Sequence, residues 1–193
     1  VLHGDTLAEA GVEAHRLAGE HGLVFVHPYD DPRIVAGQGT IALEMLQDAP
    51  ELDTLVVPVG GGGMIAGCAV AARALKQDLR VVGVETESYR AMQQLLAGQP
   101  VTAGGDTLAE GIAVRDIGPL PLAIARALVA EVLAVDEVAI ERAIALFLEV
   151  EKTVAEGAGA AGLAALLSHP GAFAGRKVGL VLCGGNIDTR LLA

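Results

Sequence analysis

The sequence contains few of the residues that mark several common classes of protein. Tryptophan is absent, aromatic residues make up 3% of the chain, and cysteine occurs twice, as Cys68 and Cys183. The two cysteines form neither a metal-ligand spacing nor a disulfide framework, so we expect a cytoplasmic location. Apolar runs long enough to span a membrane are also missing, and the first residues lack the basic and apolar regions of a signal peptide. We therefore expect no membrane partner.

Positive charge is scarce as well. The chain carries 13 Lys and Arg residues against 24 Asp and Glu residues, which gives a net charge of −11. Such a surface repels a phosphate backbone, and no basic cluster offsets the repulsion. We therefore expect no nucleic-acid partner. The chain also begins without a methionine, on apolar residues, and we interpret this as a sign that upstream sequence is missing.

The chain is instead rich in small apolar residues and in glycine. It is 52% hydrophobic and has 25 glycines, and short apolar runs alternate with longer helical patterns. Strands are expected at residues 23–26, 55–59, 80–85, 131–135 and 177–183. Helices are expected at 6–21 with Asp5 as the N-cap, from Pro32 behind the Asp31 cap, at 40–47 after an interruption at 37–39, at 64–76, at 89–97, after Pro121, at 137–151 behind the Asp136 cap, and at 157–167. This alternation predicts an α/β fold with an open, mostly parallel sheet flanked by helices.

Ligands of open parallel sheets bind beside the carboxyl ends of the strands. Three predicted strand ends carry suitable residues: the loop Gly60–Gly63, Glu85, and the run Cys183-Gly184-Gly185. The loop is the most informative, because four consecutive glycines stand between a strand and a helix. Their backbone N–H groups can converge on an anion, and the dipole of the following helix favours negative charge there.

Several interpretations of the glycine loop compete. A nucleoside triphosphate loop ends in Gly-Lys-Ser/Thr, and Met64 stands in place of that lysine, so we set this interpretation aside. A dinucleotide fingerprint is matched by Gly61, Gly63 and Ala66, with Glu85 about 20 residues further on as the ribose-binding acid. A single terminal phosphate is the third interpretation, and a tight turn without a ligand is the fourth. Four glycines lose much conformational entropy on folding, which disfavours a bare turn.

The stretch Val57-Pro58-Val59-Gly60-Gly61-Gly62-Gly63-Met64 resembles the phosphate loop of the threonine dehydratase (threonine ammonia-lyase) and serine racemase family of pyridoxal-phosphate enzymes, fold type II. Further segments are similar to that family in the same order along the chain. They are His27-Pro28, Ile34-Val35-Ala36-Gly37-Gln38-Gly39-Thr40-Ile41, Ala109-Glu110-Gly111-Ile112, Glu156-Gly157-Ala158-Gly159-Ala160 and Leu182-Cys183-Gly184-Gly185-Asn186. The match extends from His27 to the end of the chain.

The resemblance implies a role for each matching residue. Backbone N–H groups of Gly60, Gly61, Gly62, Gly63 and Met64 would hold the phosphate of pyridoxal 5′-phosphate. Cys183 would face the pyridine nitrogen with Gly184 beside it, Gly111 would lie beside the ring, and Glu156 would stand near the cofactor. A neutral thiol hydrogen-bonds the ring nitrogen without fully protonating it, which makes the ring a milder electron acceptor and suits loss of a β-hydroxyl.

Glu85 gains a different interpretation from the resemblance. In metal-dependent members of the family the corresponding acid shares a divalent cation with an acidic residue six positions later, and Ala91 occupies that position here. Hard cations need several oxygen ligands. A divalent cation at Glu85 is therefore a doubtful expectation, and a monovalent ion or no ion is an equal alternative.

The family's Schiff-base lysine lies in a motif of the type S-x-K-x-R-G, and none of Lys76, Lys152 and Lys177 stands in such a motif. We therefore expect the chain to match the C-terminal part of a threonine or serine ammonia-lyase and to be inactive alone. Residues 1–30 would end a small substrate-closing domain, and 31–193 would form most of the large cofactor-binding domain. The resemblance also implies a homodimer.

Alternative functions remain open at this point. Within the family, the parent protein would be a serine or hydroxyaspartate racemase, or a hydroxyaspartate ammonia-lyase. Outside it, the chain would be part of an NAD-binding dehydrogenase or a phosphate-binding module without catalysis.

Overall fold

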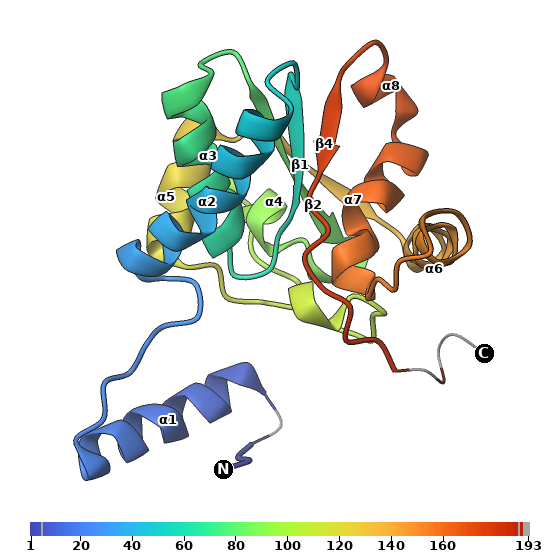
Figure 1. Cartoon of the computed structure of the whole chain (residues 1–193). Coiled ribbons are helices and arrows are strands. Elements are labelled where there is room, and N and C mark those ends of the chain that lie inside the picture. Colours follow the sequence, from blue (N-terminus) through green and yellow to red (C-terminus); the bar gives the residue numbers. More distant parts are fainter. Residues whose placement is uncertain (5, 189, 191–193) are drawn as a thin grey trace.

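The central sheet is built from four parallel strands, β1 (Thr54–Pro58), β2 (Arg80–Thr86), β3 (Glu131–Val135) and β4 (Val178–Leu180), in the order β3-β2-β1-β4 (Figure 1). They come from a computed structural model that describes residues 1–4, 6–188 and 190. Every residue of β1 is buried, as expected for a parallel strand covered on both faces. The predicted open parallel sheet is confirmed.

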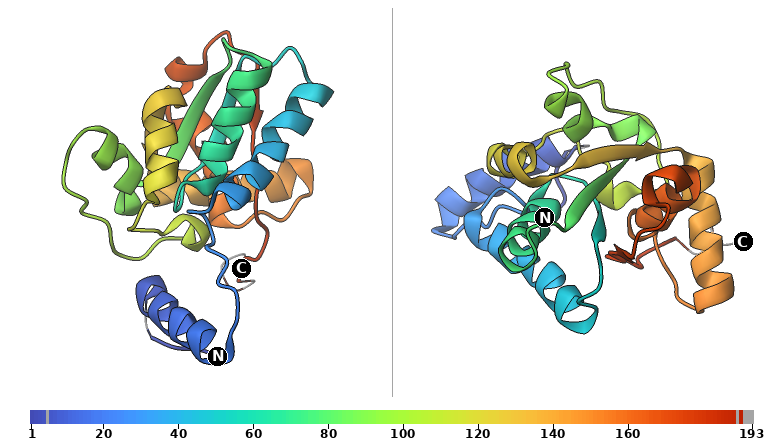
Figure 2. Two further views of the ribbon diagram at one scale, coloured as in Figure 1. Left: turned by 90° about the vertical axis from the view of Figure 1, so that its left-hand side faces the viewer. Right: turned by 90° about the horizontal axis from the view of Figure 1, so that it is seen from above.

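Helices cover both faces of the sheet (Figures 1 and 2). One face carries α2 (Pro32–Asp48), α3 (Gly63–Leu75), α4 (Ala91–Leu96) and α5 (Pro119–Leu128), which enclose one apolar core. The other face carries α6 (Glu137–Leu146), α7 (Gly157–Ser168) and α8 (Pro170–Phe173), which enclose a second. Single turns occur at η1 (Glu87–Tyr89), η2 (Glu110–Ile112) and η3 (Phe147–Glu151).

One helix replaces the two that the sequence pattern predicts around residues 37–39. The helix α2 runs without a break from Pro32, behind the predicted Asp31 cap, whose carboxylate accepts the Arg33 N–H at 2.8 Å. The glycines in its middle allow a close crossing instead of an interruption. A Cβ atom at Gly39 would lie 3.0 Å from the carbonyl oxygen of Gly67 on α3. The two helices therefore pack backbone to backbone at this point.

The N-terminal arm, residues 1–4 and 6–26, lies apart from the sheet on the side of its carboxyl ends (Figures 1 and 2). Its helix α1 (Leu7–His21) begins at a capping box of Thr6 and Glu9 and ends at Gly22, with φ of 63°. Asp5, the expected cap, lies outside the described residues. The predicted strand at 23–26 is not formed, because this extended and largely exposed segment pairs with no strand among the described residues.

Three element boundaries also differ from the sequence-based prediction. The last strand covers Val178–Leu180, and the chain continues to Cys183 without ladder pairing. The helix expected at 89–97 is the shorter α4, preceded by η1. The helix α6 ends at Leu146 and widens into the π-turn η3, after which Lys152 adopts a left-handed φ of 56°. In the part of the chain that the structure describes, none of the helices combines the length and apolar character that crossing a bilayer requires.

Candidate functional site

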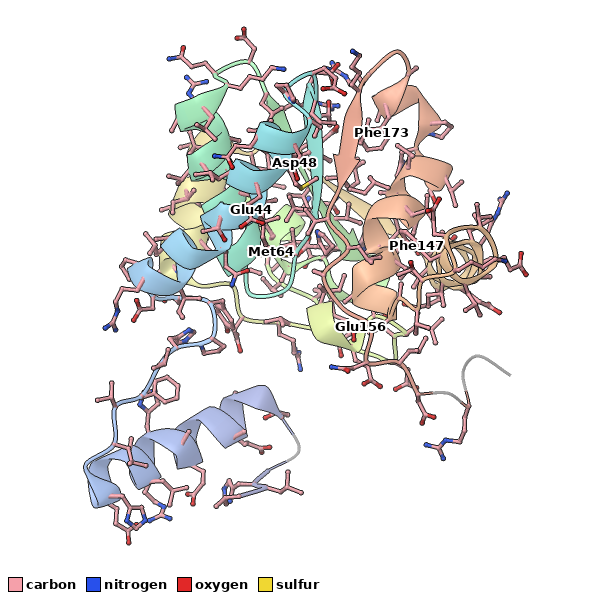
Figure 3. All side chains as sticks on the ribbon, viewed as in Figure 1. Glu44, Asp48, Met64, Phe147, Glu156 and Phe173 are labelled. Atoms are coloured by element: carbon pink, nitrogen blue, oxygen red, sulfur yellow. The ribbon has the colours of Figure 1, made fainter. Side chains whose placement is uncertain are left out.

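A cavity of about 390 Å³ opens at the carboxyl end of β1. Figure 3 labels two residues of its wall, Met64 on α3 and Glu156 before α7, which come from opposite sides of β1. The lining combines the glycine loop with segments far apart in the sequence. Its members are Pro28, Tyr29, Gln38, Pro58, Gly60, Gly61, Gly62, Gly63, Met64, Gly111, Ile112, Val114, Glu156, Ala158 and Cys183. The structure thus brings all the predicted cofactor-binding residues except Gly184 into one cavity wall, and Gly184 lies against Glu156.

The glycine loop presents a row of backbone donors. The N–H groups of Gly60 through Met64 donate to no acceptor among the described residues. The first hydrogen bond of α3 runs from the Ala66 N–H to the Gly62 carbonyl oxygen, at 3.0 Å. Unpaired N–H groups and the positive end of the helix dipole together favour an anion. The loop can therefore hold a phosphate.

Packing behind the loop also requires its glycines. An added Cβ would lie 2.3 Å from the Tyr29 ring at Gly61 and 2.9 Å from the Tyr29 backbone at Gly63. At Gly62, where φ is 95°, it would lie 2.8 Å from Pro121, and at Gly60 it would lie 3.3 Å from Val114. Neighbouring atoms thus occupy the side-chain space at Gly61, Gly62 and Gly63, so packing alone can account for these glycines and their entropy cost does not argue against a bare turn. The unpaired N–H groups remain the evidence for a ligand.

Tyr29 is a wall residue that our sequence reasoning missed. Its ring packs against Gly61, and its hydroxyl donates to the carbonyl oxygen of Asp116 at 3.0 Å. The Nδ1 atom of His27 fixes the turn by accepting the backbone N–H groups of Tyr29 and Asp30, at 3.3 and 2.8 Å. The only signal in the sequence was the position of Tyr29 next to the matching pair His27-Pro28.

Glu156 stands in a narrow space between two glycines. An added Cβ would lie 2.8 Å from its Oε1 atom at Gly111 and 2.5 Å from the same atom at Gly184. The other carboxylate oxygen accepts the Asn186 N–H at 2.8 Å, and the Glu156 N–H donates to the Gly184 carbonyl at 3.0 Å. Glu156 therefore joins the turn at Gly111 to the segment that follows β4.

Cys183 lines the cavity, and its Sγ atom lies 4.0 Å from the carbonyl oxygen of Ala158. Burial raises the pKa of this thiol, and the negative charge of Glu156 raises it further. The thiol is therefore neutral near pH 7 and can form a hydrogen bond as an uncharged group.

Glu85 lies in the core and does not line the cavity. Its side chain is 1% exposed, and its two oxygens accept the N–H groups of Met92 at 2.7 Å and Gln93 at 2.9 Å. Burial raises its pKa to about 7, although the two backbone bonds lower it. Among the described residues, no cluster of three or more His, Cys, Asp or Glu side chains could hold a metal ion. The structure thus places the Glu85 carboxylate against the backbone of α4, away from the cavity.

The three lysines lie elsewhere. Lys76 donates to the carbonyl oxygens of Pro50 and Leu52, Lys152 donates to that of Glu149, and Lys177 precedes β4. The described residues that line the cavity include no lysine.

Comparison with known proteins identifies the family. The model of the pyridoxal-phosphate dependent enzyme family matches residues 1–184. An L-threonine ammonia-lyase from Thermotoga maritima is 44% identical over 194 residues, which cover 100% of this chain and 48% of the relative. The structure of maize serine racemase superposes with a TM-score of 0.93 at 34% identity, over 100% of this chain and 61% of that one. The structure of a T.th. threonine deaminase gives a TM-score of 0.90 at 37% identity, over 97% and 63%.

These matches confirm the fold type II resemblance, and the chain spans about half to two thirds of the length of the proteins it matches. The family match covers the glycine loop, the turn at Gly111, Glu156 and Cys183 together. The chain belongs to the pyridoxal-phosphate dependent enzyme family.

Proposed function

We propose that this chain forms the cofactor-binding part of a pyridoxal-phosphate-dependent ammonia-lyase that removes the β-hydroxyl of L-threonine or L-serine. The products would be a 2-keto acid and ammonia. The observation that carries the proposal is one cavity with a row of backbone donors at Gly60–Met64 and a neutral thiol at Cys183. The similarity to an L-threonine ammonia-lyase and a threonine deaminase supports this substrate class.

The residues present fit the cofactor. Unpaired N–H groups suit its phosphate, the cavity of about 390 Å³ between the glycine loop and Gly111 has room for a flat ring, and the Cys183 thiol suits a ring nitrogen. When bound, pyridoxal phosphate supplies an electron-accepting ring that stabilises negative charge on a substrate carbon. In this proposal the loop binds the phosphate, Cys183 and Glu156 orient the ring, and Tyr29 shields the loop from water.

A binding experiment tests the cofactor site in the chain as it stands. Pyridoxine 5′-phosphate is a suitable probe because it lacks the aldehyde that would react with surface lysines. We expect it to bind more tightly than inorganic phosphate or NAD in isothermal titration, since it can use both ends of the cavity. Equal affinity for pyridoxine 5′-phosphate and inorganic phosphate would favour a phosphate-binding module, and preference for NAD would contradict the proposed cofactor.

The positions of the lysines lead to a prediction about the isolated chain. We expect residues 1–193 alone to release no 2-keto acid from L-threonine, because the described cavity wall contains no lysine. Treatment with pyridoxal phosphate and then borohydride should give no preferentially labelled lysine in peptide mass mapping. Stoichiometric labelling of Lys76, Lys152 or Lys177, blocked by pyridoxine 5′-phosphate, would contradict this account.

A racemase is the second candidate, because the superposition with maize serine racemase has a TM-score of 0.93. The two activities are separated by assaying the protein that contains this chain with L-threonine, L-serine and 3-hydroxyaspartate. Release of 2-keto acid and ammonia supports the lyase, whereas D-serine formed from L-serine without net loss supports the racemase.

We also propose a cytoplasmic homodimer in which residues 1–30 belong to a smaller domain and 31–193 to the large one. The separate position of α1 supports the division, and the 52% hydrophobic composition supports a covered face. Sedimentation velocity of the protein that contains this chain tests the dimer, since a monomer at micromolar concentration would exclude it.

A further inference from the structure

The turn at residues 107–112 forms part of the cavity wall, although it contains only a single short helical turn and no strand or longer helix. It belongs to the long connection between α4 and α5, in which η2 is the single regular turn of the described residues. Gly111 and Ile112 from this turn line the cavity, and Gly111 lies against Glu156. The position of the ring-side wall therefore depends on what fixes this turn.

Glu137, the first residue of α6, makes the polar connections. Its Oε1 atom accepts the Thr107 hydroxyl at 2.7 Å, and its Oε2 atom accepts the Leu108 N–H at 2.7 Å. The Thr107 hydroxyl in turn accepts the Ala109 N–H at 3.1 Å. Among the described residues, Glu137 is the only partner outside residues 106–115 with which these residues form hydrogen bonds.

The turn is also close enough to the site for a small shift to matter. A Cβ atom at Gly157, next to Glu156, would lie 2.2 Å from the Leu108 carbonyl oxygen. At Gly60, in the glycine loop, an added Cβ would lie 3.4 Å from the carbonyl oxygen of Gly111. Leu108 and Gly111 thus bring the turn against the two segments that meet at the cavity.

We infer that Glu137 is a positioning residue: it holds the turn that carries Gly111 and Ile112 and thereby sets the affinity of the cavity for the ring of its ligand. It acts without touching the ligand, because it lies outside the cavity lining among the described residues. The inference rests on the proposed function, in which a phosphate-bearing ring occupies this cavity. Gly61, Gly62 and Gly63 pack on Tyr29 and Pro121, which lie outside the turn, so phosphate affinity should depend on Glu137 much less than ring affinity does.

The test measures the binding of pyridoxine 5′-phosphate and of inorganic phosphate to the whole chain and to four variants. Glu137→Ala removes both acceptors. Glu137→Gln is the rescue variant, because its amide can accept the Leu108 N–H and donate to the Thr107 hydroxyl. Thr107→Val removes the hydroxyl from the other side. Glu141→Ala is the matched control, since Glu141 lies one turn later on α6, is exposed, and has no hydrogen bond or ion pair among the described residues.

The expected result is a selective loss of ring binding. Glu137→Ala should raise the Kd of pyridoxine 5′-phosphate about tenfold and leave that of inorganic phosphate within about twofold. Thr107→Val should raise the Kd of pyridoxine 5′-phosphate about threefold, and it serves as the deciding variant if Glu137→Ala does not fold. Glu137→Gln should stay within about threefold of the unmodified chain, and Glu141→Ala should match it.

Two results would overturn the inference about Glu137 and leave the proposed function intact. One is unchanged binding of pyridoxine 5′-phosphate by Glu137→Ala, or by Thr107→Val if that variant replaces it. The other is an equal loss of both ligands, which would show general damage to the fold. If the unmodified chain and Glu141→Ala bind pyridoxine 5′-phosphate no better than inorganic phosphate, the proposed function and the inference fall together.

Discussion

At the scale of single residues, Glu85 and Glu156 have the same kind of side chain but different surroundings, and we expect different roles for them. Glu85 is enclosed in the core beneath α4, where both oxygens accept backbone N–H groups. Glu156 faces the cavity, where one oxygen accepts the Asn186 N–H and the other lies between Gly111 and Gly184. The first is therefore expected to influence stability and the second the chemistry of Cys183.

Stability should depend on pH through Glu85. Burial raises its pKa from the ordinary 4.5 to about 7, so between these values the folded chain keeps a proton that the unfolded chain releases. The free energy of unfolding contributed by this group therefore falls as pH rises through that window, by about 3 kcal/mol in all. Urea unfolding at pH 5 and pH 8 measures the fall, which should be absent in Glu85→Gln.

The exposed neighbour Glu87 provides the control for this experiment, since Glu87→Gln changes the same charge at a position outside the core. It should show the pH dependence of the unmodified chain. An identical pH dependence in Glu85→Gln and the unmodified chain would show that Glu85 does not titrate in this window.

The two cysteines should react differently with iodoacetamide. Cys183 lines the cavity, whereas Cys68 is fully buried and burial raises its pKa to about 11. We expect alkylation of Cys183 alone in the folded chain, several-fold faster in Glu156→Gln, because the neutral amide no longer raises the pKa of the thiol. Mass spectrometry of tryptic peptides gives the rates. A rate unaffected by Glu156→Gln, or labelling of Cys68 at the same speed, would refute this assignment.

At the scale of elements, the crossing of α2 and α3 fixes the helix that follows the glycine loop. An added Cβ at Gly67 would lie 2.2 Å from the Val35 carbonyl oxygen and 2.6 Å from the Gly39 nitrogen. These are backbone atoms of α2, so neither helix can move aside without disturbing the other. The loop Gly60–Gly63 leads into α3, whose first residue is Gly63, and the crossing therefore fixes the position of the end of the loop.

Two glycine substitutions near this crossing should have opposite effects. Gly67→Ala should lower the free energy of unfolding by about 3 kcal/mol, because the new methyl group overlaps backbone. Gly37→Ala should raise it by up to about 1 kcal/mol, since Gly37 is exposed within a helix and nothing lies within 4 Å of an added Cβ. Urea denaturation measures both. A stabilising Gly67→Ala would show that the helices can separate.

Local patterns predicted much of the sheet and most of the cavity. Buried runs of Val and Leu marked β1 and β2, and the strand-end rule located Gly60–Gly63 and Cys183. Long-range contacts explain the errors. The glycines at 37–39 suggest a break until the facing Gly67 is known, and Glu137 resembles an ordinary first-turn acid until the connection it holds is seen.

At the scale of the whole molecule, a layered body and a separate arm meet at residues 27–31. His27 and Tyr29 tie this junction to the body through the hydrogen bonds of the turn and the packing on Gly61. The arm before it exposes Leu23, at 62%, and Val24, at 82%, in extended chain. The arm and the body are therefore expected to differ in local stability.

Thermolysin should cut the chain first within residues 22–26, because this segment is extended, apolar and exposed. The remaining body should resist further cleavage and bind pyridoxine 5′-phosphate within about twofold of the uncut chain, since the junction at 27–31 is retained. Mass spectrometry of a digestion time course identifies the first cut. An initial cut inside the body would contradict this division.

The filled space around Gly60–Gly63 has a consequence for mutational scanning. Selection for folding alone would reject most substitutions in this loop, because new side chains meet Tyr29, Pro121 or Val114. Intolerance at these positions would therefore give no information about whether a cofactor binds. Cys183 and Glu137 have side chains that the packing accommodates, so substitutions at these two positions would report more directly on ligand binding.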